Sequence, residues 1–133
     1  MISEKPNTLT KNERLYKNKQ IEILFSEGEA FISYPLRIVF LKRDKQHDEP
    51  DVRMMVSVSK KKFKRAVKRN RVKRLVREAY RLNKSEFNNV CTQHNIGLDI
   101  AFLFLKNELP DFEEIEKAVL KTAVLLDKKL KGE

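Results

Sequence analysis

The segment Leu98–Leu105 restricts the fold more than any other part of this sequence. Side chains on both faces of an extended strand are apolar here, and Asp99 is the exception. A strand of this kind is covered on both sides by other parts of the protein. The longest apolar run, Ile100–Leu105, is far shorter than the roughly 18–20 residues that cross a bilayer. The sequence therefore predicts a globular domain with a deeply buried strand and no membrane partner.

Two further segments alternate between apolar and mixed positions and read as strands, Leu36–Lys42 and Val52–Val58. The polar run Asp44–Asp51 lies between them and contains a proline, which predicts a hairpin loop joining the two strands. The residues Phe31–Ser33, ended by Pro35, allow a further short strand. The sheet is therefore expected to be mainly antiparallel.

A first helix is expected near residue 18. Asn18 can cap its N-terminus by accepting a backbone hydrogen bond, and Ile21, Leu24 and Phe25 then share one face. Gly28 can adopt the left-handed turn that ends a helix.

A rival start of this helix uses Thr10 and Glu13 as a capping box. It ranks lower because the apolar residues that follow fall off the face that carries Ile21. Residues 1–13 are therefore expected to form a flexible tail, and residues 1–133 a single domain.

The last helix is expected to start at Asp111, an N-cap with Glu114 three residues further on. Its apolar positions recur with helical spacing and form one buried face: Phe112, Ile115, Val119, Ala123, Leu126 and Leu130. With 133 residues, the chain suits one domain. The predicted fold is an α+β two-layer sandwich with the element order α-β-β-(β)-α-β-α.

The positive charge of the chain is concentrated in one short segment. Lys and Arg total 29 against 19 Asp and Glu, a net charge of +10. Residues 60–84 hold 13 of the basic side chains and one acid, so this segment carries the whole excess. Such a concentration is typical of a site for a polyanion rather than of general solubilisation.

Within this segment, residues 68–84 have helical periodicity. One stripe is apolar: Val72, Leu75, Val76, Ala79 and Tyr80. A second stripe, about 150° away around the helix, is basic: Asn70, Arg74, Arg77, Arg81 and Lys84. Arg69 would fall on the core side if the helix ran through it. The helix is therefore expected to begin near Arg69–Asn70, with Arg69 projecting from its first turn.

A solvated helix face is the usual explanation of a charge run, but such faces mix signs. Here Glu78 is the one acid, and like charges three or four residues apart repel one another. An outside anion relieves that repulsion. Because the guanidinium group bridges phosphate oxygens and stacks on bases, the abundance of arginine favours RNA.

Other kinds of site find little support. Cys91 and His94 form half a zinc site at most, so a partly buried thiol and a loop histidine are expected, and His47 falls in a polar loop. Neither a catalytic triad nor a glycine-rich phosphate loop stands out. The acids at 113, 114 and 116 suit the start of a helix. A single cysteine and no signal-peptide core predict a cytoplasmic protein.

The segment Lys68–Arg77 (KRNRVKRLVR) resembles the "RNR" signature of the bacterial ribonuclease P protein subunit. Val56–Lys61 (VSVSKK) is similar to the strand end that precedes it in that family. Weaker similarity to the family's first helix is carried by Arg14, Leu15, Asn18, Phe25 and Gly28. The resemblance spans residues 14 to 130.

The resemblance implies an RNA-binding subunit of an enzyme whose catalyst is RNA. In this family the RNA cleaves precursor tRNA at the 5′ end of the mature sequence with RNA-bound Mg²⁺, and the protein itself binds no cofactor. The implied partners are the catalytic RNA and precursor tRNA, with no obligate protein partner. The resemblance also implies a left-handed β-α-β crossover, and a cleft between the first helix and the sheet that holds the 5′ leader.

Matched residue by residue, the motif implies these RNA-binding residues: Arg69, Asn70, Arg71, Lys73, Arg74 and Arg77. Lys60 and Lys61 match the basic pair before the motif, and Arg81 continues the basic stripe. Phe25 matches a cleft aromatic and Phe40 a second one, on which single-stranded bases would stack at roughly 1–3 kcal/mol each. For both phenylalanines the alternative is packing in the core.

The chain departs from the family pattern in two places. The usual Gly-Asn before the motif is replaced by Lys62–Arg65, one residue longer, which leaves the path of this loop open. Ile21 stands where the family often has an aromatic, which removes one stacking surface. Two alternatives remain, a structural RNA-binding protein such as a ribosomal component and a self-contained ribonuclease, but no residues suggest the latter.

Overall fold

The computed structural model describes residues 9–132. Along this part of the chain the elements follow in the order η1 (Lys11–Glu13), α1 (Asn18–Glu27), β1 (Glu29–Ser33), β2 (Leu36–Arg43), β3 (Val52–Ser57), α2 (Ala66–Leu82), α3 (Lys84–His94), β4 (Gly97–Phe104) and α4 (Phe112–Leu130). None of the helices in this range is long and apolar enough to span a membrane.

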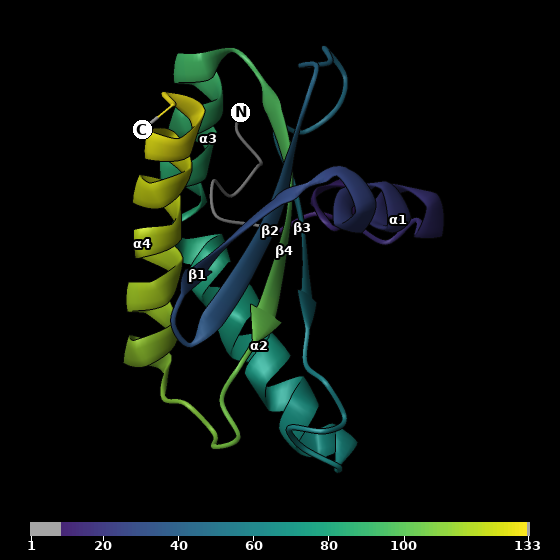
Figure 1. The fold of residues 1–133 in the computed structure, drawn as a ribbon, viewed down its shortest axis with the longest axis vertical. Coiled ribbons are helices and arrows are strands. Elements are labelled where there is room, and N and C mark those ends of the chain that lie inside the picture. Colours follow the sequence, from purple (N-terminus) through teal and green to yellow (C-terminus); the bar gives the residue numbers. More distant parts are fainter. Residues whose placement is uncertain (1–8, 133) are drawn as a thin grey trace, which may run out of the picture.

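Within residues 9–132 the strands form one four-stranded sheet in the order β1-β2-β4-β3. The helices α2, α3 and α4 cover one face of the sheet, and α1 lies alone against the other face (Figure 1). The α+β sandwich is therefore confirmed, with α1 as a partial cover on the second face.

β4 is the central strand, as its two apolar faces predict. It pairs antiparallel with β2 and parallel with β3, and all of its residues except Leu103 are buried. The prediction of a hairpin between β2 and β3 was wrong, because β4 lies between them. Alternation within a strand shows which side chains share a face, but it contains no information about the neighbouring strand.

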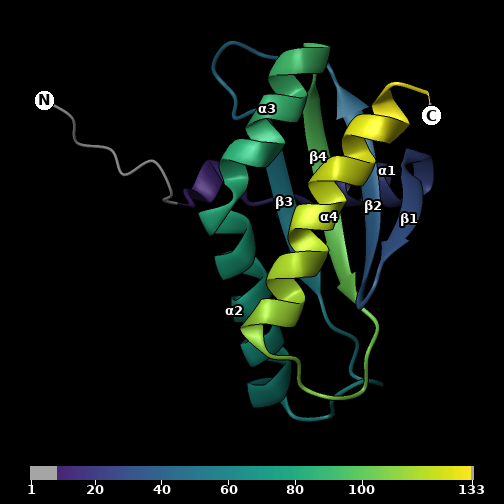
Figure 2. The ribbon, with the colours of Figure 1, turned by 90° about the vertical axis from the view of Figure 1, so that its left-hand side faces the viewer.

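The parallel strands β3 and β4 are joined by α2 and α3. Seen from the helix side, both strands run downward, and the chain passes from β3 on the left, through the helices in front, to β4 on the right (Figure 2). This is a left-handed crossover, the rare sense for such a connection, and it confirms the expectation from the resemblance.

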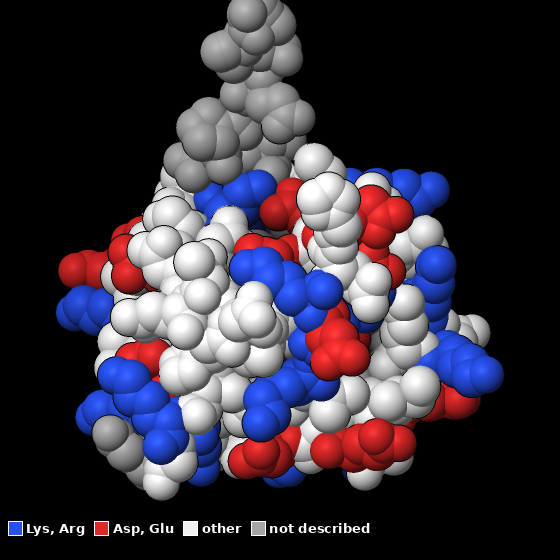
Figure 3. Space-filling model, turned by 90° about the horizontal axis from the view of Figure 1, so that it is seen from above, with Lys and Arg blue, Asp and Glu red and all other residues white. Residues whose placement is uncertain are grey.

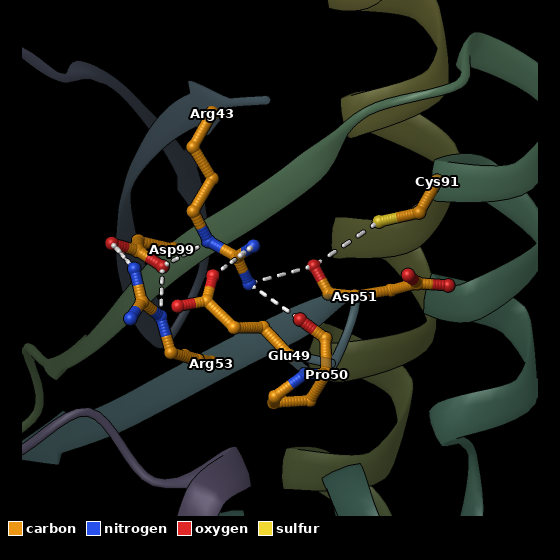
Figure 4. Close-up of polar contacts among 7 residues, drawn as sticks. All are labelled: Arg43, Glu49, Pro50, Asp51, Arg53, Cys91 and Asp99. Carbon is orange, nitrogen blue, oxygen red and sulfur yellow. Dashed lines mark hydrogen bonds and ion pairs between the residues drawn. The ribbon is translucent and has the colours of Figure 1, made fainter. Parts of the chain in front are cut away.

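The loop between β2 and β3 crosses the end of β4 and is fastened there (Figure 4). Arg43 donates from Nε to Asp99 Oδ1 at 2.9 Å and from Nη2 to the carbonyl oxygens of Pro50 and Asp51 at 2.7 and 3.0 Å. Arg53 donates to both carboxylate oxygens of Asp99, at 2.9 and 3.0 Å. The charge of the buried Asp99, the exception in the apolar run, is thereby matched by guanidinium groups.

The first helix differs from the prediction at both ends. Lys17 is its N-cap and Asn18 is already helical, without a side-chain hydrogen bond at the cap. Gly28 does end the helix, but its φ of −78° is not left-handed. A side chain here would collide with the carbonyl oxygens of Leu24 and Phe40, so the close approach of helix and strand requires the glycine.

The capping box that ranked lower does form, around the short turn η1. The Thr10 backbone N–H donates to Glu13 Oε1 at 2.8 Å. The chain then joins the edge of the sheet, where Leu15 N donates to Met54 O at 2.8 Å and Leu15 is buried. Residues 9–13 of the predicted tail therefore include a turn at the sheet edge, and residues 1–8 lie outside the described part.

The long basic helix was predicted to begin near Arg69–Asn70 and to run to Lys84, and both bounds were wrong. α2 begins at Ala66 and ends at Leu82, and a separate helix, α3, follows at once. Lys84 therefore belongs to α3, a helix that was not predicted from the sequence. The last helix is confirmed, since Asp111 Oδ1 accepts from Glu114 N at 2.8 Å.

The main core lies between the sheet and the helices α2, α3 and α4. Its centre is an aromatic cluster in which Tyr80 and Phe87 are 5.1 Å apart between ring centroids, and each lies 6.4 Å from Phe102. A smaller cluster under α1 contains Leu15, Leu24, Val39 and Ala101.

Candidate nucleic-acid interface

The exposed side of α2 carries the predicted basic residues at its N-terminal half. Asn70, Arg71 and Arg74 are exposed, and Lys73 and Arg77 are half-buried. The helix shows this side to solvent because its opposite side, with the buried residues Val72, Val76, Ala79 and Tyr80, packs on the core. Lys60 and Lys61 are exposed just beyond the end of β3. These residues form one basic surface, called the α2 surface below.

Arg69 does not project from the helix as predicted. Its Nη1 donates to the carbonyl oxygens of Phe63 and Lys64 at 2.9 and 2.7 Å, because α2 begins three residues before it. Phe63 is buried and stacks on Phe104 with ring centroids 6.2 Å apart. The longer loop at 62–65 is thus anchored on the core and fastened to α2 by Arg69.

The C-terminal end of the predicted stripe is largely paired within the protein. Arg81 Nη2 lies 2.7 Å from Glu78 Oε2, and this hydrogen bond raises the pKa of Arg81. Lys84 is buried and lies 2.9 Å from Glu13 Oε2. The α2 surface is therefore centred on residues 70–77 and does not extend to Lys84 as predicted.

Arg77 marks the point where the α2 surface meets the N-terminal segment. Partial burial lowers its pKa, and so does the positive charge of nearby Arg14. No sequence pattern linked these two arginines, because they come together only when Arg14 joins the edge of β3.

The two predicted cleft phenylalanines lie on opposite sides of the sheet. Phe25 is 45% exposed on α1. Phe40 is 2% exposed and packs edge-to-face on Phe31 within the core below α4. Phe40 therefore fills the core, which was the alternative interpretation, and it does not face α1.

The sheet face beside α1 has an uncovered row that was not predicted from the sequence. Ile32, Arg37, Leu103 and Ser57 are register partners across all four strands and share one face. Ile32 and Arg37 are exposed, and the other two are half-buried. An arginine at an otherwise apolar position of β2 was the available signal. The row lies next to the chain segment that leads to Lys60, so it adjoins the α2 surface.

The face shown in Figure 3 lacks this concentration of one charge. At the end where α4 finishes, Lys and Arg alternate with Asp and Glu (Figure 3). Among the described residues, no three His, Cys, Asp or Glu side chains are grouped so that they could hold a metal ion.

Cys91 and His94 both differ from expectation. Cys91 is fully buried, its thiol lies 3.7 Å from the Asp51 carbonyl, and burial raises its pKa to about 12. His94 is the last residue of α3 rather than a loop residue, with Nε2 2.8 Å from Asp127 Oδ1.

The chain is similar to ribonuclease P proteins in sequence and in structure. The Ribonuclease P family profile matches residues 9–127. The ribonuclease P protein component of Porphyromonas gingivalis is 51% identical over 116 residues, which are 87% of this chain and 84% of that protein. The corresponding protein of Chlorobium phaeobacteroides is 34% identical over 122 residues, 85% of this chain and 84% of that protein. The ribonuclease P protein from Thermotoga maritima matches with a TM-score of 0.65 and 26% identity, covering 84% of this chain and 94% of that structure.

Proposed function

Because the chain belongs to the family of ribonuclease P protein components, we propose that its α2 surface binds the RNA subunit of ribonuclease P. In that family role it takes part in maturation of the 5′ end of tRNA together with the RNA subunit. The alternative of a ribosomal protein finds no support in the comparisons.

One observation carries the proposed RNA contact, namely the exposed cations of α2 on a helix whose other side is fixed to the core. The backbone of Asn70, Arg71 and Arg74 is fixed by a packed helix, so binding of a phosphate costs only side-chain conformational entropy. Each cation that neutralises a phosphate releases condensed counterions, which makes the affinity salt-dependent.

The uncovered row on the α1 side suits the single-stranded 5′ leader of precursor tRNA. Unpaired bases stack on exposed aromatic and apolar side chains, and Phe25 and Ile32 provide such surfaces. Arg37 lies between the apolar members of the row and can meet a phosphate between two bases. Phe25 alone remains of the two phenylalanines first assigned to this contact.

The proposed division of labour leaves the cleavage chemistry to the RNA and its Mg²⁺ ions. The α2 surface consists of cations and an amide, which bind phosphates but do not activate water at neutral pH. The protein's own residues bind the RNA subunit, reduce repulsion between the two RNAs and extend the contact to the leader. A cytoplasmic location accords with a buried, unpaired Cys91.

Reconstitution with the cognate RNA subunit at low Mg²⁺ tests the proposal, with release of the 5′ leader as the readout. The chain is expected to stimulate cleavage, and Arg74→Ala to reduce that stimulation. Lys129→Ala, an exposed cation on the last turn of α4, is the matched control and should behave as the unmodified chain. Cleavage by RNA-free protein, or no stimulation by the chain, would contradict the proposal.

A further inference from the structure

A pocket outside the α2 surface lies between the N-terminal segment, the start of α1 and the loop that crosses β4. Its volume is about 160 Å³, and its lining includes Arg14, Tyr16, Lys17, Asp48, Glu49 and Arg53. This is smaller than the roughly 300–1,000 Å³ of ordinary small-molecule sites. It can receive one planar ring rather than a whole cofactor.

The walls of this pocket carry opposite charges. Arg14 and Lys17 line one part, and Asp48 and Glu49 line the part contributed by the crossing loop. Arg53 is already engaged, since it donates to both carboxylate oxygens of Asp99. A simple anion site would not present carboxylates to its ligand. The pocket instead suits a group that brings hydrogen-bond donors to the acids and a negative charge to the cations.

Tyr16 provides an aromatic surface at the rim. Its side chain is 54% exposed, and the Lys11 ammonium lies 5.8 Å from its ring centroid. An exposed aromatic ring beside cations is the combination on which unpaired bases stack, because every base has a π-face and the neighbouring phosphates need positive charge. Packing in the core does not explain a ring that is half in water.

Arg14 connects the pocket with the α2 surface. Arg14 forms a β-bridge with Met54 at the edge of β3, and its positive charge contributes to lowering the pKa of Arg77 on α2. Within residues 9–132 neither of these arginines takes part in an ion pair. Glu13, the acid next to Arg14, is occupied by Lys84. The two guanidinium groups therefore repel each other until a phosphate is placed near both.

We propose that this pocket binds one unpaired nucleotide of an RNA strand that continues from the α2 surface. The base stacks on Tyr16 with its exocyclic amino group toward Asp48 and Glu49, and the adjoining phosphates lie near Arg14 and Arg77. Carboxylates accept hydrogen bonds from base amino groups in this way. The inference rests on the proposed function, and the strand belongs either to the RNA subunit or to the precursor tRNA.

Binding of the full-length chain to the cognate RNA subunit, and of the reconstituted enzyme to precursor tRNA with and without its leader, tests the proposal. Tyr16→Ala is expected to weaken binding by at least about fivefold, as loss of one stacked base does, and Tyr16→Phe to retain it. Tyr34→Ala, an exposed tyrosine at the opposite edge of the sheet, is the control for RNA-subunit binding. A loss with the RNA subunit alone assigns the base to that RNA, and a loss only with leader-bearing precursor assigns it to the leader.

Asp48→Asn separates recognition of a base from charge alone. If the carboxylate accepts a hydrogen bond from a base, binding weakens; if it merely repels RNA, binding strengthens, and the proposed pocket is overturned. Unchanged binding in Tyr16→Ala with both RNAs overturns it as well. Arg74→Ala separates the nucleotide pocket from the proposed function. If Arg74→Ala weakens RNA binding and Tyr16→Ala does not, the pocket is overturned and the proposed function is retained.

Discussion

Lys84 Nζ lies 2.9 Å from Glu13 Oε2, and the two side chains are 11% and 14% exposed. The pair joins the turn η1 to the first residue of α3 across 71 positions of sequence. Lys84 is therefore not part of the exposed basic stripe of α2, and its ion pair holds the N-terminal segment against the helices.

Glu13→Gln is therefore expected to destabilise the fold. Removing one partner leaves a nearly buried ammonium group, at a cost of about 3 kcal/mol, the low end for buried pairs because some solvent remains. The midpoint of urea unfolding measures the loss. The double variant Glu13→Gln, Lys84→Met should recover part of it, and equal stability of single and double variants would contradict the assignment.

Arg74→Ala and Arg77→Ala are each expected to lower the affinity for the RNA subunit. The slope of log affinity against log salt should become shallower by about one for each phosphate that the variant no longer neutralises. Filter binding across a salt series is the measurement, with Lys129→Ala as control. Two unchanged slopes would remove the α2 surface as the binding site.

Arg69→Ala is expected to act on the loop rather than on phosphate. Its guanidinium holds the carbonyl oxygens of Phe63 and Lys64, and loss of such charged hydrogen bonds costs about 1.5–3 kcal/mol. Thermal unfolding should show a lower midpoint, whereas the salt slope of RNA binding should change less than in Arg74→Ala. A full unit of slope lost without loss of stability would place Arg69 on the RNA instead.

Substitutions of the two phenylalanines are expected to affect different properties, stability for Phe40 and RNA binding for Phe25. Phe40→Ala is expected to cost about 3–5 kcal/mol of stability, as for other buried aromatic rings. Phe25→Ala should leave the unfolding midpoint nearly unchanged and weaken binding of leader-bearing precursor tRNA. Leaderless tRNA is the control substrate, and an equal effect on both substrates would exclude a leader contact at Phe25.

Alkaline pH should weaken the fold through Cys91. Burial raises the pKa of the folded thiol to about 12 from its ordinary value of 9.0, so the unfolded chain loses this proton first. The contribution is complete below pH 9 and is lost as pH rises toward 12. Unfolding midpoints between pH 8 and about 11 should fall less steeply in Cys91→Ala than in the unmodified chain. If the midpoints of both proteins fall equally with pH, the thiol does not contribute to the pH dependence of stability.

Much of the fold could be predicted because it depends on local pattern. The two-sided apolar strand, the capped last helix and the alternation of β2 and β3 all appear in the structure. The position of β4 between β2 and β3 could not be predicted in this way, since pairing joins residues distant in sequence. α3 was missed because its polar residues obscured Phe87, Val90 and Cys91, whose spacing could have identified it.

In the candidate site, too, local spacing predicted some residues, whereas others depend on contacts that are distant in sequence. Exposed residues on one helix, such as Asn70 and Arg74, follow from helical spacing alone. Arg69 and Lys84 could not be assigned from spacing, because their partners lie in a loop and in an N-terminal turn. Phe40 was misplaced for a different reason, since a strand residue belongs to either face until the sheet's covering helices are known.

The insertion of β4 between β2 and β3 has a consequence for synthesis on the ribosome. When the chain has emerged as far as His94, the residues of both flanking strands are outside the tunnel, but those of the strand between them are not. The arginine-rich helix thus leaves the exit tunnel before the strand that closes its supporting sheet. Chains that stop before residue 97 would retain the cations but lack the platform that orients them.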